Sequence, residues 1–180
     1  MRPSQVVQFF ELVARLKALQ RTGWVRSGVC VPETVASHSY GVAMLALLLG
    51  DGDAQVLKLA LVHDLAESLV GDITPKCGIS PREKAVLEDE AFRKIRDDVL
   101  SGSEAGCELY ALFREYEEAN TPAAVFVHQL DKLDMVLQAL TYENTQENME
   151  LTEFFEACNG IQHEKLREIC SFLLQQRQRH

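Results

Sequence analysis

The sequence has no excess of positive charge and no long apolar run, and both absences narrow the classes of protein to consider. Its 18 Lys and Arg residues stand against 27 Asp and Glu residues, which gives a formal net charge of −9 at pH 7. Because a polyanionic partner requires a basic surface, we expect no nucleic acid polymer and no membrane among its partners. No apolar run approaches the roughly 20 residues of a membrane span.

Motifs built on cysteine are also missing. The five cysteines are an odd number and form no C-x-x-C pair, which predicts reduced thiols and argues against a zinc knuckle. The amino-terminal MRPSQVVQFFELVARLKALQR mixes apolar and polar residues with a helical period, without the continuous apolar stretch of a signal peptide. These features predict a cytoplasmic location.

The chain does contain enough apolar material for one domain. Its 180 residues, 47% hydrophobic and 25% charged, fit a single globular domain spanning 1–180. Apolar residues recur at spacings of three and four, and no segment shows the alternation of a β-strand, so an all-α fold is predicted. The expected helices cover about 6–19, 37–50, 54–70, 81–99, 104–118 and 122–143, and one or two more helices are expected over 152–176.

Three of these helices carry specific expectations. The second is expected to begin at an N-cap serine, Ser37, and to be buried on most sides because it is almost entirely apolar. The third is expected to run without a break from Ala54 to Val70. The fourth carries the acidic run REKAVLEDEAF, including Glu88, which is expected to form a solvated face. A position of Glu88 near the site is the alternative, which no sequence pattern supports.

The third helix places ionisable groups in an apolar stretch. LALVHDLAESLVGD, residues 59–72, contains His63, Asp64, Glu67 and Asp72 among leucines, valines and alanines. On a helix, the first three of these side chains can face one cavity. A solvated stripe is the simpler alternative, but ionised groups left unpartnered in apolar surroundings are costly. The pattern therefore favours a metal or catalytic cluster.

Two further residues, His38 in ASHSYGVAML and Asp131 in FVHQLDKLDMVL, lie in similar surroundings. A lone histidine near a helix start is more often a capping or core residue. Together with His63 and Asp64, however, they make two imidazoles and two carboxylates, a set that suits a divalent metal cation with open positions. The residues leave the ion undecided among Mn, Co, Fe, Ni, Zn and Mg.

The order H…HD…D resembles the metal site of the HD-domain phosphohydrolases. The surrounding RTGWV, PETVASHSY, LVHDLAESLVGDITP and QLDKLDMVLQALTYE, within residues 8–143, resemble the 5'-deoxynucleotidases of the HD-domain-containing protein 2 group. The resemblance implies a single helical HD domain. It also implies one divalent cation held by four ligands, which are His38, His63, Asp64 and Asp131.

The same resemblance implies roles for residues near the metal. Arg21 matches the arginine that holds the phosphate, which suits its planar and permanently charged guanidinium. Glu67 and Asp72 match an acidic pair with two alternative roles. In some relatives the pair binds a second cation with the backbone at Ile73, and in others it contacts the substrate. The sequence leaves both open.

One position departs from the bacterial relatives, which carry a tryptophan directly after the arginine that Arg21 matches. Thr22 stands there in this chain, and the single tryptophan is Trp24. Selectivity for deoxyribose is therefore open, and Trp24 is either a sugar contact or a core residue. His128 shares a helical face with Asp131 and could be a ligand by geometry, but the family pattern does not use it, so a structural role is expected.

The expected function is metal-dependent removal of the 5'-phosphate from (deoxy)nucleoside 5'-monophosphates, with a small-molecule nucleotide as substrate. Two alternatives remain: another HD chemistry, on a cyclic nucleotide, a nucleoside triphosphate or an alarmone, and a non-catalytic nucleotide-binding sensor. The resemblance and the apolar amino-terminal helix, with Phe9, Phe10 and Val13, predict a homodimer. The alternative is that this apolar face covers the core of the monomer.

Overall fold

The computed structural model describes residues 1–178, and its regular structure there is helical apart from one isolated bridge between Gln20 and Thr34. The α-helices are α1 (Pro3–Ala18), α2 (Thr22–Arg26), α3 (Val35–Leu49), α4 (Ala54–Val62), α5 (Glu67–Val70), α6 (Pro81–Lys94), α7 (Glu104–Glu118), α8 (Pro122–Thr145), α9 (Thr152–Phe155) and α10 (Glu164–Arg177). Shorter 3-10 or π turns cover Pro75–Cys77, Ile95–Val99 and Glu156–Gly160. The predicted all-α fold is confirmed.

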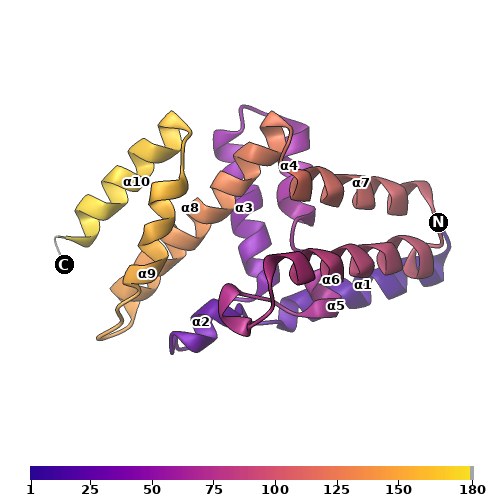
Figure 1. Ribbon diagram of the computed structural model, residues 1–180, viewed down its shortest axis with the longest axis horizontal. Coiled ribbons are helices and arrows are strands. Elements are labelled where there is room, and N and C mark those ends of the chain that lie inside the picture. Colours follow the sequence, from indigo (N-terminus) through magenta and orange to yellow (C-terminus); the bar gives the residue numbers. More distant parts are fainter. Residues whose placement is uncertain (179–180) are drawn as a thin grey trace.

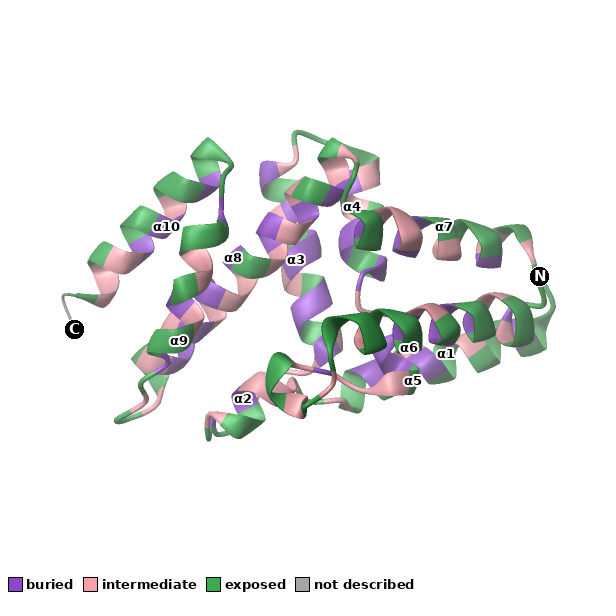
Figure 2. Cartoon of the chain, in the orientation of Figure 1, coloured by how far each residue is buried: buried purple, intermediate pink, exposed green. Residues whose placement is uncertain are grey.

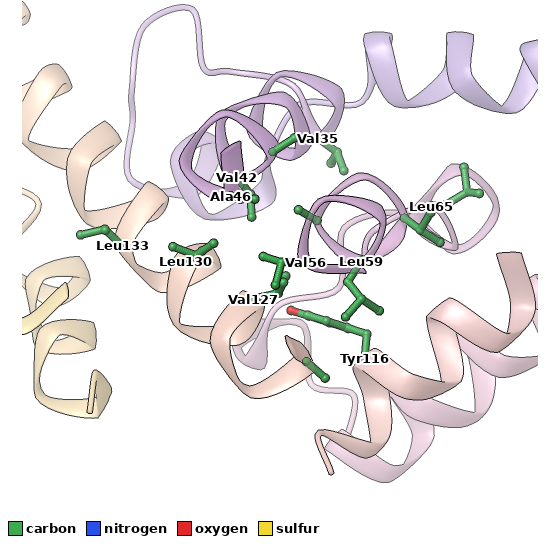
Figure 3. Close-up of a cluster of buried hydrophobic side chains, with 14 of the residues drawn as sticks. Val35, Val42, Ala46, Val56, Leu59, Leu65, Tyr116, Val127, Leu130 and Leu133 are labelled. Atoms are coloured by element: carbon green, nitrogen blue, oxygen red, sulfur yellow. The ribbon is translucent and has the colours of Figure 1, made fainter. Parts of the chain in front are cut away.

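Helices α3, α4 and α8 pack against one another at the centre of the molecule (Figure 1). Helices α1, α6 and α7 lie on one side of this centre, and α9 and α10 lie on the other, along α8. The buried residues gather where the central helices meet (Figure 2). Val42 from α3, Leu59 from α4 and Leu130 from α8 belong to this core (Figure 3). None of the helices in residues 1–178 is long and apolar enough to cross a membrane.

The helix starts follow their capping residues. The Thr34 hydroxyl accepts a hydrogen bond from Ser37 N, so α3 begins at Val35 and the prediction of Ser37 as N-cap is wrong. Ser80 caps α6 in a reciprocal pair with Glu83, which orders the start of this charged helix. The N-cap residues Thr34 and Ser80 therefore determine the first residues of α3 and α6.

The expectation that α3 is buried on most sides is also wrong. One of its faces carries four exposed apolar side chains. The reason is the number of neighbours, because α3 packs against α1, α4 and α8 and no other helix in residues 1–178 contacts it substantially. The exposed residues are Tyr40, Met44, Leu47 and Leu48.

The predicted continuous helix over 54–70 is interrupted. α4 ends at Val62, a turn covers 63–66, and α5 begins at Glu67. The ring Nδ1 of His63 lies 2.8 Å from Ala60 O, the carbonyl that Asp64 N–H would bond in an unbroken α-helix. The following bonds, such as Glu67 N to Asp64 O at 3.1 Å, are of the tighter three-residue type. The motif therefore lies on a turn between two helices.

Candidate active site

The packing of α3, α4 and α8 brings together the four predicted metal ligands. His38 lies on α3, His63 and Asp64 follow the end of α4, and Asp131 lies on α8. The two histidine Nε2 atoms are 3.4 Å apart. Asp64 Oδ2 lies 3.6 Å from His38 Nε2 and 3.3 Å from His63 Nε2. The ligand atoms of His38, His63 and Asp64 all lie within 4.8 Å of one another. Asp131 Oδ1 lies 3.1 Å from His38 Nε2 but outside that group.

The hydrogen bonds of the two rings test whether this cluster fits a cation. His63 Nδ1 contacts Ala60 O, and His38 Nδ1 contacts Asp134 Oδ2 at 2.7 Å. Because carbonyl and carboxylate oxygens only accept, each Nδ1 carries the ring hydrogen and each Nε2 of a neutral ring presents a lone pair. The two lone pairs and the Asp64 carboxylate then face one another, with the Asp131 carboxylate next to His38. The donor set fits a divalent cation, which would neutralise this arrangement.

Protons compete for the same ligand atoms. Burial and the charge of Arg21 lower the pKa of His38, but its hydrogen bonds to Asp131 and Asp134 outweigh them and raise it to about 10. Burial alone would raise the pKa of Asp64, yet the adjacent imidazoles of His63 and His38 hold it well below its usual range. A cation that binds here must therefore displace protons from the histidines.

Arg21 and Asp72 lie together beside the cluster of histidines and aspartates. Arg21 Nη1 is 3.8 Å from Asp64 Oδ2, and its backbone N–H is fixed by Glu33 O at 3.0 Å. Asp72 Oδ2 accepts a hydrogen bond from Thr22 N at 2.6 Å, and the Thr22 hydroxyl donates to Asp72 O at 2.8 Å. Asp72 thus holds the first residue of α2 and, with it, the backbone next to Arg21.

Glu67 is a buried acid, with 4% of its surface exposed. Burial raises its pKa to about 10, and the charges of Asp64 and Asp72 act in the same direction. At neutral pH its carboxyl group is therefore protonated. Glu67 is a proton donor three residues along the chain from an ionised ligand.

A pocket of about 630 Å³ opens next to Arg21 and is within the size range of small-molecule sites. Asp72 and Ile73 form part of its wall, as do Met135, Lys76 and Phe154. Trp24 borders it but is only 1% exposed. Its indole donates to Glu33 Oε1 at 2.9 Å, and its ring packs against those of Tyr142 and Phe154. The structure therefore makes Trp24 a core residue at the base of the pocket.

Glu88 lies near the site, and its position in the structure differs from the predicted one. It is 7% exposed, so the prediction that it lies on a solvated face is wrong. It precedes the fully buried Phe92 by four residues, a spacing that could have placed it on the inner face of α6. Glu88 pairs with Lys84 at 3.5 Å, and the charge of Lys84 acts on Glu67 and Asp64.

His128 is placed away from the ligand cluster, as expected. Its Nε2 lies 2.9 Å from Tyr116 O and its ring stacks on that of Tyr116. These contacts hold the end of α7 against α8 and give His128 a structural role. Asp134, which contacts His38, is a residue of the site that the sequence patterns do not indicate.

Fold and site together define a class: all-helical proteins with a buried cluster of histidines and aspartates beside a small-molecule pocket. A family model of the HD domain matches residues 13–172, and the chain belongs to the HD-domain family.

Proteins with similar sequences match this chain over nearly its whole length. The 5'-deoxynucleotidase HDDC2 of Dictyostelium discoideum is 40% identical over 178 residues, which cover 91% of this chain and 93% of the relative. The 5'-deoxynucleotidase HDDC2 of Homo sapiens is 38% identical over 173 residues, with 93% and 84% covered. The crystal structure of the PH0347 protein from Pyrococcus horikoshii superposes with a TM-score of 0.78 at 35% identity, covering 93% and 97%.

Proposed function

We propose that this chain is a divalent-metal-dependent 5'-deoxynucleotidase that hydrolyses the 5'-phosphate of deoxynucleoside 5'-monophosphates. The observation that carries the proposal is that Arg21 both approaches the cluster around His38 and His63 and lines a pocket of about 630 Å³. The names of the relatives support the same reaction. A non-catalytic sensor would not require a protonated acid such as Glu67 beside the ligands.

Four residues would hold the cation: His38, His63, Asp64 and Asp131. The chemistry that such an ion supplies when bound is Lewis-acid activation of water and neutralisation of phosphoryl charge. Arg21 contributes a fixed cation at 3.8 Å from Asp64 Oδ2, the oxygen that the two histidines also contact. Its guanidinium binds two phosphoryl oxygens at once and stabilises the charge that they carry while the bond to the 5'-oxygen breaks.

Glu67 donates the proton that the leaving 5'-oxygen requires. Its pKa of about 10 supports this role, because the carboxyl group holds a proton at neutral pH and lies beside the ligand Asp64. The alternative is that Glu67 and Asp72 bind a second cation with the backbone at Ile73. The two roles predict different numbers of ions per chain. Asp72 Oδ2 is occupied by Thr22 N, so we assign its other oxygen to the sugar 3'-hydroxyl or to that cation.

The test is phosphate release from 5'-dNMPs, 5'-NMPs and 3'-dNMPs in the presence of Mn²⁺, Co²⁺, Ni²⁺, Zn²⁺ or Mg²⁺. We expect release from the 5'-monophosphates, with deoxyribose preferred, and none from an Asp64→Ala variant, which loses a ligand. Turnover only of cyclic nucleotides, triphosphates or alarmones would assign a different HD reaction. Nucleotide binding without any turnover would identify a sensor.

We also propose a homodimer in the cytoplasm. The apolar face of α1 is divided: Phe9 packs against the core, as the monomer alternative requires, whereas Val7 and Phe10 are 61% and 58% exposed. Beside them, an apolar groove of about 350 Å³ runs between α1, α4 and α7. Exposed apolar surface of this kind favours self-association.

All five cysteines, which lie within residues 1–178, are free thiols, as a reducing compartment would keep them.

A further inference from the structure

His38 is held from the side of its ring that faces away from the cluster. Its imidazole is fully buried, and Nδ1 lies 2.7 Å from Oδ2 of Asp134. Asp134 follows Asp131 by three residues on α8, so both carboxylates project toward α3 from one helical face. His63, by comparison, is held by Ala60 O, a carbonyl of α4, the helix that directly precedes it. Of the two histidines, His38 is the one that depends on a side chain from another helix for its orientation.

The approach of Asp134 to α3 requires a glycine. Gly41 follows His38 by three residues on α3, and a Cβ atom added there would lie 2.2 Å from Asp134 Oδ1 and 3.1 Å from its Cγ. The first distance is far shorter than any van der Waals contact. Because the carboxylate is already bonded to His38 on its other oxygen, it cannot move away without releasing the ring.

The position of Gly41 has no other conformational explanation. It lies inside the regular helix Val35–Leu49 and is not among the glycines with positive φ. A glycine in a helix interior costs about 1 kcal/mol relative to alanine. The chain therefore carries an unfavourable helix residue at the one place where the carboxylate of Asp134 fills the space of a side chain.

We propose that Asp134 is a positioning residue for the metal ligand His38 and that Gly41 is required because it makes room for the Asp134 carboxylate. The carboxylate fixes the hydrogen on Nδ1, so Nε2 is left as the donor atom aimed at Asp64 and His63. A hydrogen bond of this kind also makes the ligand more basic, and its loss lowers metal affinity by roughly 10- to 100-fold in other proteins. The proposal rests on the metal site and not on the identity of the substrate.

The test compares Co²⁺ binding to the full chain and its variants Asp134→Ala, Asp134→Asn, Gly41→Ala and the double variant Gly41→Ala/Asp134→Ala. Affinity is measured by calorimetry, and the absorption spectrum of bound Co²⁺ reports the ligand geometry. We expect Asp134→Ala and Gly41→Ala each to weaken binding by about 10-fold or more and to change the spectrum. In the Asp134→Ala background, Gly41→Ala should cost no further affinity and should raise the melting temperature of the metal-free protein, because alanine is the better helix residue.

Asp98→Asn, an exposed aspartate outside the site, is the matched control and should leave affinity and spectrum unchanged. If Asp134→Ala does not fold, the nearly isosteric Asp134→Asn decides the first part, because its amide oxygen can still accept from Nδ1 but no longer carries the charge that makes His38 a more basic ligand. Wild-type affinity and spectrum in a folded Asp134 variant would overturn the positioning role. An equal loss of affinity from Gly41→Ala with and without Asp134 would overturn the role of the glycine. Because no readout uses turnover, failure of the proposed nucleotidase reaction would leave these results unaffected.

Discussion

At Asp64 and Glu67, three residues apart, two carboxyl groups of similar intrinsic acidity are held in opposite protonation states. Burial acts on both in the same direction, so it cannot explain the difference. The imidazoles of His63 and His38 lower the pKa of Asp64, whereas Glu67 faces the charges of Asp64 and Asp72, which raise its pKa further. The site therefore holds an ionised carboxylate and a neutral acid three residues apart, and such a pair can divide the work of charge stabilisation and proton donation.

Glu67→Gln removes the proton of this acid while keeping its shape. We expect kcat for a 5'-dNMP to fall by roughly 100-fold or more, the scale of a lost acid or base group. Because glutamine is neutral, like Glu67 in the folded chain, the melting temperature of the metal-free protein should not fall. Elemental analysis should find the same number of ions as in the wild type.

Glu90→Gln, on the exposed side of α6, is the control for this change. A wild-type kcat in Glu67→Gln would contradict the role as acid. The loss of one of two ions would assign Glu67 to a second cation site instead.

Individual ligands are easier to predict from the sequence than the residues that support them. Imidazoles and carboxylates within apolar stretches suggest a metal or catalytic site, but they do not select its members, because His128 and Asp134 lie in the same stretch as Asp131. The family resemblance is what singles out the four proposed ligands. Asp134 cannot be selected in this way, because its partner His38 is 96 residues away and no local pattern connects them. The charges around Glu88 suggest a surface position, although its spacing from Phe92 points inward.

Among whole elements, those with capping residues and prolines are predicted closely. α7 spans Glu104–Glu118 as expected, after the N-cap Ser103, and α8 begins at Pro122, after Thr121. The break between α4 and α5 is not predictable, because LALVHDLAESLV contains no proline or glycine. It arises from the competition of a side chain, His63, for a helix carbonyl, a tertiary consequence of building the site.

The short helix α2 depends on Asp72. Replacing Asp72 with alanine leaves Thr22 N, a free N–H of the first turn of α2, without its acceptor, so we expect the free energy of unfolding to drop by about 1 kcal/mol. Because Arg21 immediately precedes α2, kcat/KM for a 5'-dNMP should also fall. A substrate without a 3'-hydroxyl separates the proposed roles.

If Asp72 contacts the sugar, the variant and the wild type should hydrolyse that substrate equally well. If Asp72 binds a second cation, the defect should persist and added Mg²⁺ should partly relieve it. Wild-type stability and wild-type rates together would exclude all of these roles.

Helix α6 carries a pH-sensitive contact in Glu88. Burial raises its pKa to about 7, against the attraction of Lys84 and with the repulsion of Glu117 and Asp64. An unfolded glutamate has a pKa of about 4.3. Below that pKa, the folded and the unfolded chain both hold the proton, and the contribution of Glu88 to the free energy of unfolding is fully present. Between the two values the folded chain holds a proton that the unfolded chain has lost, so stability decreases as the pH rises toward 7, by at most about 1.4 kcal/mol per pH unit.

The change that tests this is Glu88→Gln, measured by urea unfolding of the metal-free protein from pH 5 to pH 8. The difference in unfolding free energy between variant and wild type should grow in favour of the variant over this range and level off above pH 7. Glu90→Gln on the same helix serves as the control, and its free energy of unfolding should change with pH as that of the wild type does. If the free energy of unfolding of Glu88→Gln also follows the pH dependence of the wild type, folding does not raise the pKa of Glu88.

At the scale of the whole molecule, the sequence predicts the cluster of histidines and aspartates better than it predicts the pocket. The resemblance covers residues 8–143, whereas the pocket wall also contains Phe154 from α9, and α10 packs along α8. No motif marks Phe154 as part of a site. It belongs there because the chain after α8 turns back along that helix, so Phe154 lies against Trp24, with ring centroids 4.2 Å apart.

The proposed dimer can be tested by charge placed on its apolar surface. Phe10, 58% exposed on α1, should be buried in the interface, so Phe10→Glu should place an unpaired carboxylate there and separate the subunits. We expect sedimentation equilibrium at micromolar concentration to give twice the chain mass of 20.2 kDa for the wild type and one chain mass for the variant. The circular dichroism spectrum of the variant should remain helical.

Phe172→Glu is the matched control, because Phe172 is 59% exposed on α10, across the molecule from α1 (Figure 1). This variant should remain a dimer. A wild-type chain that is monomeric at micromolar concentration would contradict the proposed homodimer. If Phe172→Glu separates the subunits and Phe10→Glu does not, the chain dimerises through α10. In that case the groove between α1, α4 and α7 is not the interface.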